Sequence, residues 1–206
     1  MTSSGMRPER PSVVMAAELS DLTGRVLQFW FGLRDAASAP VQRPEWFRVD
    51  AAFDAACAKD FRDASARAAA GELDALAATA HGALALVLLL DQLPRNIHRG
   101  RPQAFAADGR ARAVAAAAID QNFDQAFVPV QRQFFYLPFE HSEDLADQER
   151  AVALFRALAE PHLLQWAERH RNVIARFGRF PHRNAILGRQ SSAEELAFLE
   201  RPGSSF

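Results

Sequence analysis

Asp91 is the first residue whose position predicts chemistry, because it directly follows the apolar run Leu88–Leu90 in a segment with the pattern of a buried helix. A carboxylate taken out of water costs on the order of several kcal/mol unless a cation or a hydrogen bond compensates it. Arg95, one helical turn further on, is the nearest candidate partner. Two interpretations stay open here: a structural Asp–Arg pair that closes a helix, or a carboxylate of a functional site.

A second polar segment surrounds one histidine, His141, with the carboxylates Glu140, Glu143 and Asp144. Carboxylates raise the pKa of a neighbouring histidine, and together with it they could bind a divalent metal. The chain has no His-x-x-x-His or Glu-x-x-His pair, so we predict no metal site. The structural alternative is a helix start capped by Ser142, with His141 as an orienting hydrogen-bonding residue.

A third segment gathers arginines: Arg179, Arg183 and Arg189 lie close in sequence to His182 and Asn184. Forked guanidinium donors beside the free N–H groups of the next helix start are suited to bind an anion. That anion is a phosphate, a carboxylate of a ligand, or one of the protein's own acids. In the last case the arginines form a purely structural ion-pair network with the first two segments.

Helices are the elements that must position these residues. Alanine, the strongest helix former, is abundant and β-branched residues are scarce, so the composition favours an all-α fold. Apolar periodicity and capping residues predict about eight helices in antiparallel pairs, with Pro94 and Pro138 as helix ends. We expect a flexible N-terminal tail over residues 1–22 and a single all-helical domain over 23–206. The predicted helices span about residues 23–31, 50–70, 73–93, 108–119, 124–139, 142–159, 161–177 and 191–200.

Composition also narrows the class of protein. The chain has 206 residues and a net charge of −1, which argues against bulk electrostatic binding of nucleic acid. Its single cysteine, Cys57, forms no internal disulfide, which favours a reducing compartment, and we predict the cytoplasm. No apolar run is long enough for an export signal or a membrane span, so we predict no membrane partner. Gly-rich nucleotide motifs and the Gly-x-Ser-x-Gly motif are absent, and we predict no cofactor.

Recognisable motifs occur in the segments Phe29–Phe31, Trp46–Phe47, Leu88–Asn96, Phe105–Asp108, Tyr136–Asp144, Gln148–Arg150, His170–Arg171, Arg176–Asn184 and Leu187–Arg189. These segments resemble motifs of the bacterial DUF924 family over roughly residues 26–200. The resemblance implies an all-helical fold similar to the tetratricopeptide-like superfamily, a right-handed array of helix pairs. It implies no reaction and no catalytic residue, because the family name denotes unknown function. At Leu93 and Leu137 the chain differs from the residues expected for the family, Phe and Met.

Polar residues gather at helix ends and loops, as in a single pocket, rather than along successive helix faces. The first hypothesis is a helical binding module that holds a small anionic molecule or the acidic end of a peptide or protein. The alternative is an enzyme, hydrolase-like and with or without the assistance of a metal, with a His/carboxylate acid–base pair and an arginine clamp. The sequence indicates no oligomeric state. The candidate pocket residues are Asp91, Arg95, Glu140, His141, Glu143, His170, Arg179, His182, Arg183, Asn184 and Arg189.

Overall fold

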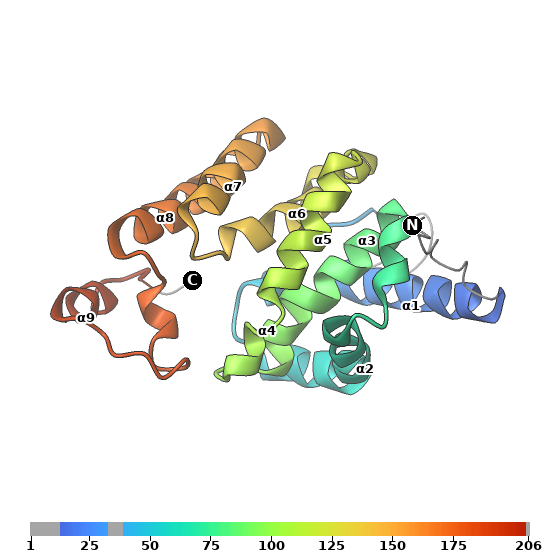
Figure 1. Ribbon diagram of the computed structural model, residues 1–206, viewed down its shortest axis with the longest axis horizontal. Helices are drawn as coiled ribbons and strands as arrows, with labels where there is room; N and C mark the ends of the chain where they lie inside the picture. Colours follow the sequence, from blue (N-terminus) through green and yellow to red (C-terminus); the bar gives the residue numbers. More distant parts are fainter. Residues whose placement is uncertain (1–12, 33–38, 205–206) are drawn as a thin grey trace, which may run out of the picture.

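Helices and short 3-10 turns make up the computed structural model, which describes residues 13–32 and 39–204 (Figure 1). No strand occurs in these two ranges, so the predicted all-α fold class is confirmed. Packing of consecutive helices against one another is consistent with the tetratricopeptide-like arrangement. The α-helices are α1 (Val13–Phe31), α2 (Ala51–Ala70), α3 (Ala80–Val87), α4 (Leu93–Ile97), α5 (Asp108–Asp120), α6 (Pro129–Glu140), α7 (Leu145–Leu158), α8 (Pro161–Phe177) and α9 (Ala193–Leu199).

Helix α1 begins ten residues before the predicted start at Thr23, so the tail expected over 1–22 is wrong for residues 13–22. Leu22 is buried with Val26 in the core, and this apolar face extends the helix toward the N-terminus. Thr23 does not cap the helix, because its hydroxyl donates to the Leu19 carbonyl inside it, at 2.8 Å. Residues 1–12 of the predicted tail lie outside the described residues.

The most buried element is one continuous rod, Ala80–Ile97, in which a π-helical turn joins α3 to α4. In this turn the Leu93 N–H donates to the carbonyl of Leu88, five residues back. Pro94 has no N–H to offer the carbonyl of Leu89, and the Ser65 hydroxyl donates to that carbonyl instead, at 2.7 Å. The expected helix end at Pro94 is therefore wrong, because the wider turn accommodates the proline and the helix continues to Ile97.

A second proline, Pro138, also lies inside a helix rather than at its end. Helix α6 continues to Glu140, and the His141 N–H still donates to the Leu137 carbonyl at 2.9 Å. Asp144, not Ser142, is the N-cap of α7, since its side chain accepts from the backbone N–H of Ala146. As a result, the polar segment forms a tight corner between α6 and α7.

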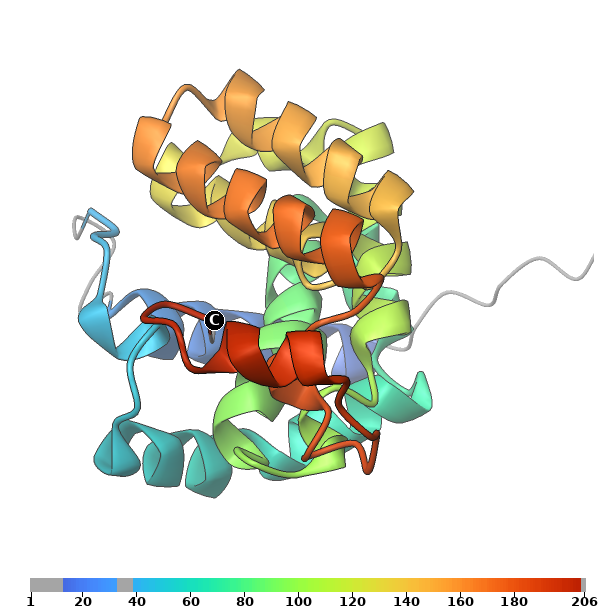
Figure 2. The ribbon, with the colours of Figure 1, turned by 90° about the vertical axis from the view of Figure 1, so that its left-hand side faces the viewer.

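The apolar core divides into two clusters of very different size. The large cluster of buried residues extends from Leu22 to Ala167 and includes stacked aromatic rings. The small cluster holds Val173, Ile174 and Phe180, at the end of α8 and the beginning of the C-terminal segment, residues 178–204. Figure 2 shows this segment, in red, below the layer formed by α6, α7 and α8. A polar pocket lies where the segment meets the helices of the large core.

Candidate functional site

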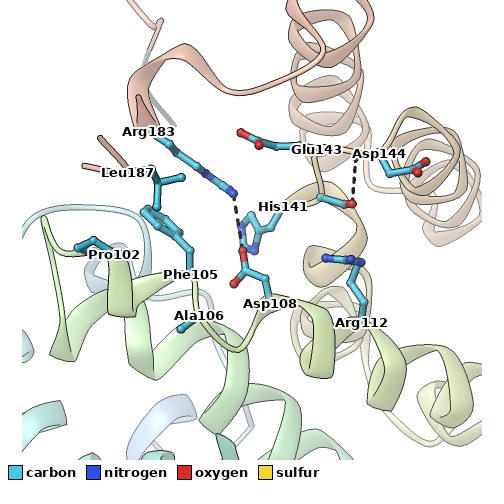
Figure 3. Close-up of a pocket in the computed structure, with 11 residues that line it drawn as sticks. Pro102, Phe105, Ala106, Asp108, Arg112, His141, Glu143, Asp144, Arg183 and Leu187 are labelled. Atoms are coloured by element: carbon cyan, nitrogen blue, oxygen red, sulfur yellow. Dashed lines mark hydrogen bonds and ion pairs between the residues drawn. The ribbon is translucent and has the colours of Figure 1, made fainter. Parts of the chain in front are cut away.

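An open pocket of about 500 Å³ lies at the junction of three parts of the chain (Figure 3). The first part is the start of α5 with the loop before it, the second is the corner between α6 and α7, and the third is the C-terminal segment. Each part contributes polar side chains from a helix end or a loop. The lining residues are Pro102, Phe105, Ala106, Asp108, Arg112, His141, Ser142, Glu143, Asp144, Arg183 and Leu187.

Behind the pocket, the π-helical turn holds Asp91 completely out of water. Arg95 lies 3.2 Å from one oxygen of Asp91 and also donates two hydrogen bonds to Asp108, at 3.0 and 3.1 Å. The Gln92 side chain donates to the other oxygen of Asp91 at 2.6 Å. Burial acts to raise the pKa of Asp91, but the attraction of Arg95 and the hydrogen bonds from His141 and Gln92 outweigh it, and the pKa falls well below its ordinary value. The predicted Asp91–Arg95 pair is therefore present.

His141 joins this buried network to the pocket. Its Nδ1 lies 2.9 Å from the Asp91 carboxylate, while the ring lines the pocket. Burial and the positive charge of Arg95 lower the pKa of His141, against the opposite effect of Asp91. An ionised Asp91 accepts hydrogen bonds only, so Nδ1 carries the proton and donates it. The geometry thus leaves Nε2 of a neutral imidazole as the acceptor.

Arg183 approaches the pocket from the opposite side, between two aromatic rings. Its guanidinium carbon lies 4.7 Å from the centre of the Phe105 ring and 4.5 Å from that of Phe180. The side chain is only 8% exposed, and the one ion pair that it makes with the described part of the chain is a 3.6 Å approach to Asp108, drawn in Figure 3. Burial and the charge of Arg95 lower the pKa of Arg183 to about 10. The guanidinium is thus fixed by the rings but poorly neutralised.

Glu143 ties the C-terminal segment to the helical core. Its carboxylate accepts two hydrogen bonds from Arg189, at 2.6 and 2.9 Å, and one from the backbone N–H of Phe180, at 2.8 Å. Burial acts to raise the pKa of Glu143, but these donors outweigh it and lower the pKa. This one side chain therefore fixes the beginning of the segment on which Arg183 is carried.

Glu140 and His170 form a second buried pair next to the pocket. The His170 Nδ1 lies 3.1 Å from Glu140 and 2.9 Å from the Trp166 carbonyl. Burial and the nearby charge of Asp91 raise the pKa of Glu140 to about 8. Burial lowers the pKa of His170 to about 3, although its bond to Trp166 acts the other way. Both groups are consequently neutral at neutral pH, and neither lines the pocket.

Comparisons with known proteins agree with this architecture. The family model described as DUF924, bacterial protein of unknown function, matches residues 26–203. The chain belongs to this family. A solved structure of a protein of unknown function from Agrobacterium tumefaciens is 44% identical, with a TM-score of 0.80, and the match covers 88% of this chain and 98% of that one. No curated protein matches the chain significantly.

The structure brings most of the predicted polar residues of this DUF924 chain into one neighbourhood. His141, Glu143 and Arg183 line the pocket, and Asp91, Arg95, Glu140, His170 and Arg189 contact or adjoin them from behind.

The other predicted residues, Arg179, His182 and Asn184, do not line the pocket. Arg179 donates to Glu195 of α9 at 2.6 and 2.8 Å, which makes it part of an internal ion pair. Asn184 is buried and donates to the Ser191 hydroxyl at 3.0 Å. His182 packs its ring on Phe180, with 5.6 Å between ring centroids, and burial and the charge of Arg183 lower its pKa to about 4. These contacts organise the C-terminal segment.

Sequence reasoning missed Phe105 and Asp108, which complete the site around Arg183. Both belong to a segment that matched the family, Phe105–Asp108, and an acid at a helix start after a conspicuous aromatic was an available signal. Arg112, Ser142 and Asp144 were also missed as lining residues.

Over residues 13–32 and 39–204, no three His, Cys, Asp or Glu side chains are grouped as metal ligands would be. Within the same part of the chain, no helix has the length and apolar character that crossing a membrane requires.

Proposed function

We propose that the pocket binds an anionic group, of a small molecule or of the acidic end of a peptide, which Arg183 receives. One observation carries the proposal: Arg183 is nine-tenths buried, points into the pocket, and makes no side-chain hydrogen bond within the described residues. Its Nε is buried without a partner. A buried cation with unused donors is costly, and a ligand anion would supply the missing hydrogen bonds.

A carboxylate fits the pocket better than a phosphate. Asp108, Glu143 and Asp144 line the same cavity and would repel a phosphate dianion more strongly than a carboxylate monoanion. The planar guanidinium can donate two parallel hydrogen bonds to a carboxylate. The stacked rings of Phe105 and Phe180 hold that guanidinium in one plane, so little side-chain freedom is lost when the ligand binds.

Thermal-shift and calorimetric titration with acetate, succinate, benzoate and inorganic phosphate test the proposal. We expect one or more carboxylates to raise the melting temperature, because a ligand at 100 times its Kd adds ~2.7 kcal/mol of stability. Arg183→Gln should abolish the effect, and Arg156→Gln, at an exposed position of α7, should not. No shift with any carboxylate, or equal shifts in wild type and Arg183→Gln, contradicts the proposal. A response to phosphate alone contradicts the preference for carboxylates.

The carboxylate belongs either to a free metabolite or to the acidic end of a peptide, and a further titration separates the two sources. Short peptides with a free C-terminal carboxylate are compared with the same peptides amidated. Binding of succinate or benzoate that exceeds binding of every free-ended peptide identifies a small-molecule site. The reverse order, with binding lost on amidation, identifies a peptide-end site.

A second candidate function is enzymatic, with the bound anion as substrate. The observation that favours it is the hydrogen bond from His141 Nδ1 to buried Asp91, since a carboxylate that orients an imidazole toward a pocket is an arrangement that acid–base catalysis uses. In this candidate Arg183 is the clamp that positions the substrate.

We also propose a cytoplasmic location. Its support is Cys57, the one cysteine of the chain, which is a free and fully buried thiol. Burial and the charge of Asp54 raise the pKa of this thiol to about 12, so it is an unreactive core residue that tolerates a reducing compartment. Expression of a fluorescent fusion and cell fractionation test the location, and recovery of the protein from the periplasm or medium contradicts it.

A further inference from the structure

We propose that His141 is the general base of a hydrolytic site, which activates a water molecule against the carbonyl of a small ester that carries a carboxylate. The inference rests on the proposed function, because Arg183 is assigned to hold that carboxylate. It adds the reacting atom, the nucleophile and the substrate class.

The reacting atom is Nε2 of His141. Nδ1 is occupied by the 2.9 Å bond to Asp91, and the His141 side chain makes no other hydrogen bond among the described residues. Asp91 itself cannot turn away, because Arg95 and the Gln92 side chain hold its two oxygens. The buried network therefore fixes both the tautomer and the plane of the ring, and the remaining nitrogen serves the pocket that the ring lines.

Charges around the imidazole suit a base that works at neutral pH. Asp91, Arg95 and Asp108 act on the pKa of His141 from the π-helical turn, α4 and α5. The charged groups that line the same pocket are Arg112, Glu143, Asp144 and Arg183. His170 and His182 also interact electrostatically with His141, and burial holds the pKa of each well below its ordinary value. Burial and the charge of Arg95 lower the pKa of His141. The ring is therefore neutral at neutral pH and can accept a proton. Once protonated, the imidazolium is stabilised by the ionised Asp91 directly behind it.

We assign water as the nucleophile because no described residue that lines the pocket offers a free hydroxyl or thiol. Ser142 carries the one hydroxyl among the lining residues, and that hydroxyl donates to Asp147 at 2.6 Å and accepts from the N–H of Asp144. Cys57 is fully buried in the large apolar core and does not line the pocket. The pocket is open to solvent and His141 lines it, so the proposal takes the water from the pocket itself.

The step balances without a further reactant. Nε2 takes a proton from water while the water oxygen bonds to the ester carbonyl carbon, and the carbonyl π electrons move onto its oxygen. The carbonyl then re-forms, the bond to the leaving oxygen breaks, and Nε2–H returns the proton to that leaving group. The products are a carboxylic acid and an alcohol, and the histidine regains its starting state.

Two activated esters test the inference, mono(4-nitrophenyl) succinate with a carboxylate and 4-nitrophenyl acetate without one. We expect the wild-type chain to prefer the succinate ester. His141→Gln should lower kcat about 10²–10⁴-fold, whereas Arg183→Gln should chiefly raise KM for the succinate ester. His162→Gln, at an exposed position of α8, is the matched control and should retain wild-type rates. A single turnover in H₂¹⁸O should place one ¹⁸O in succinate, with no acyl-protein detected by mass spectrometry.

The outcomes separate this inference from the binding proposal. A protein that binds succinate but hydrolyses neither ester faster than His141→Gln overturns the inference and leaves the binding proposal in place. Failure to bind any carboxylate overturns both. An acyl-protein intermediate overturns water as the nucleophile. If His141→Gln does not fold by circular dichroism, ¹⁵N NMR of the wild-type imidazole decides, because an Nε2–H tautomer at neutral pH overturns the assignment of the base.

Discussion

Different forces stabilise the helical core and the C-terminal segment. The core, with buried residues from Leu22 to Ala167, consists of apolar helices whose aromatic and leucine side chains are almost fully out of water. The C-terminal segment, residues 178–204, contributes one residue, Phe180, to a cluster of three buried apolar residues. Its fixed points are ion pairs, above all Glu143 with Arg189 and Arg179 with Glu195. The core therefore depends on buried apolar area, and the segment depends on charge.

This difference has a consequence for the pocket, which lies between the two regions. His141 and the network behind it belong to the core, whereas Arg183 belongs to the segment. His141, the proposed base, is thus held rigidly by the core. Arg183, the proposed ligand-binding cation, lies on the C-terminal segment, which buries less apolar surface. Such a part opens locally at lower free energy than the core does.

The largest effect is expected from truncation inside the core. Phe134 is fully buried and packs on Trp46, with ring centroids 5.0 Å apart, so Phe134→Ala should cost about 3–5 kcal/mol of unfolding free energy. Phe198, only partly buried against Phe177 in the small cluster, is the comparison position, and Phe198→Ala should cost clearly less. Urea denaturation measures both. Equal costs would contradict the contrast between the two regions.

A smaller change in stability, dependent on pH, is expected from Glu140, at the boundary between the core and the pocket. With a pKa near 8, folded Glu140 keeps its proton while the unfolded chain loses it above about 4.5. The folded state thus binds more protons over this range, so stability should fall as pH rises from 4.5 through 8. Glu140→Gln removes this fall, and its melting temperature relative to wild type should increase between pH 6.5 and 9.

The pH range above 6.5 keeps the opposite effect of His170 out of the measurement. Its folded pKa of about 3 makes the folded state bind fewer protons below 6.5, which lowers stability as pH falls toward 3. Glu149→Gln, at an exposed position of α7, is the matched control and should follow the wild-type curve. A difference between Glu140→Gln and wild type that stays constant from pH 6.5 to 9 would show that Glu140 is ionised in the folded protein.

The smallest change in global stability is expected when only the segment is released. Glu143→Ala removes the acceptor of two Arg189 bonds and of the Phe180 N–H. Hydrogen bonds to a charged group contribute about 1.5–3 kcal/mol, so amides of residues 178–204 should exchange with solvent about tenfold faster or more. Exchange in α3 should not change. Glu194→Ala, which removes an exposed pair with Arg176, should leave the segment protected. Faster exchange in the core as well would contradict a separate opening of the segment.

Local patterns in the sequence predicted much of the fold correctly. Helix α8 begins at Pro161 and ends before Gly178, whose φ of 67° is the left-handed conformation expected of a helix-ending glycine. Ser192 and Glu195 form a capping box at the start of α9, within the helix predicted over about 191–200. Both signals depend on residues a few positions apart, which is why they can be recognised without the tertiary structure. Pro94 and Pro138 misled the prediction because the energetic cost of a proline in a helix depends on what else satisfies the freed carbonyl.

The sequence by itself determined that Asp91 is a buried carboxylate in need of a cation and that Arg95 is close enough to supply one, since both facts follow from one apolar helix. It could not assign the arginines. Arg179 pairs with Glu195 and Arg183 does not, although both lie in the same short stretch. Only the tertiary structure brought Phe105 and Asp108 to Arg183, because a guanidinium pairs with whatever the packing of distant helices places beside it. Helix formation is a local property of the chain, whereas the neutralisation of a buried charge depends on contacts between segments far apart in sequence.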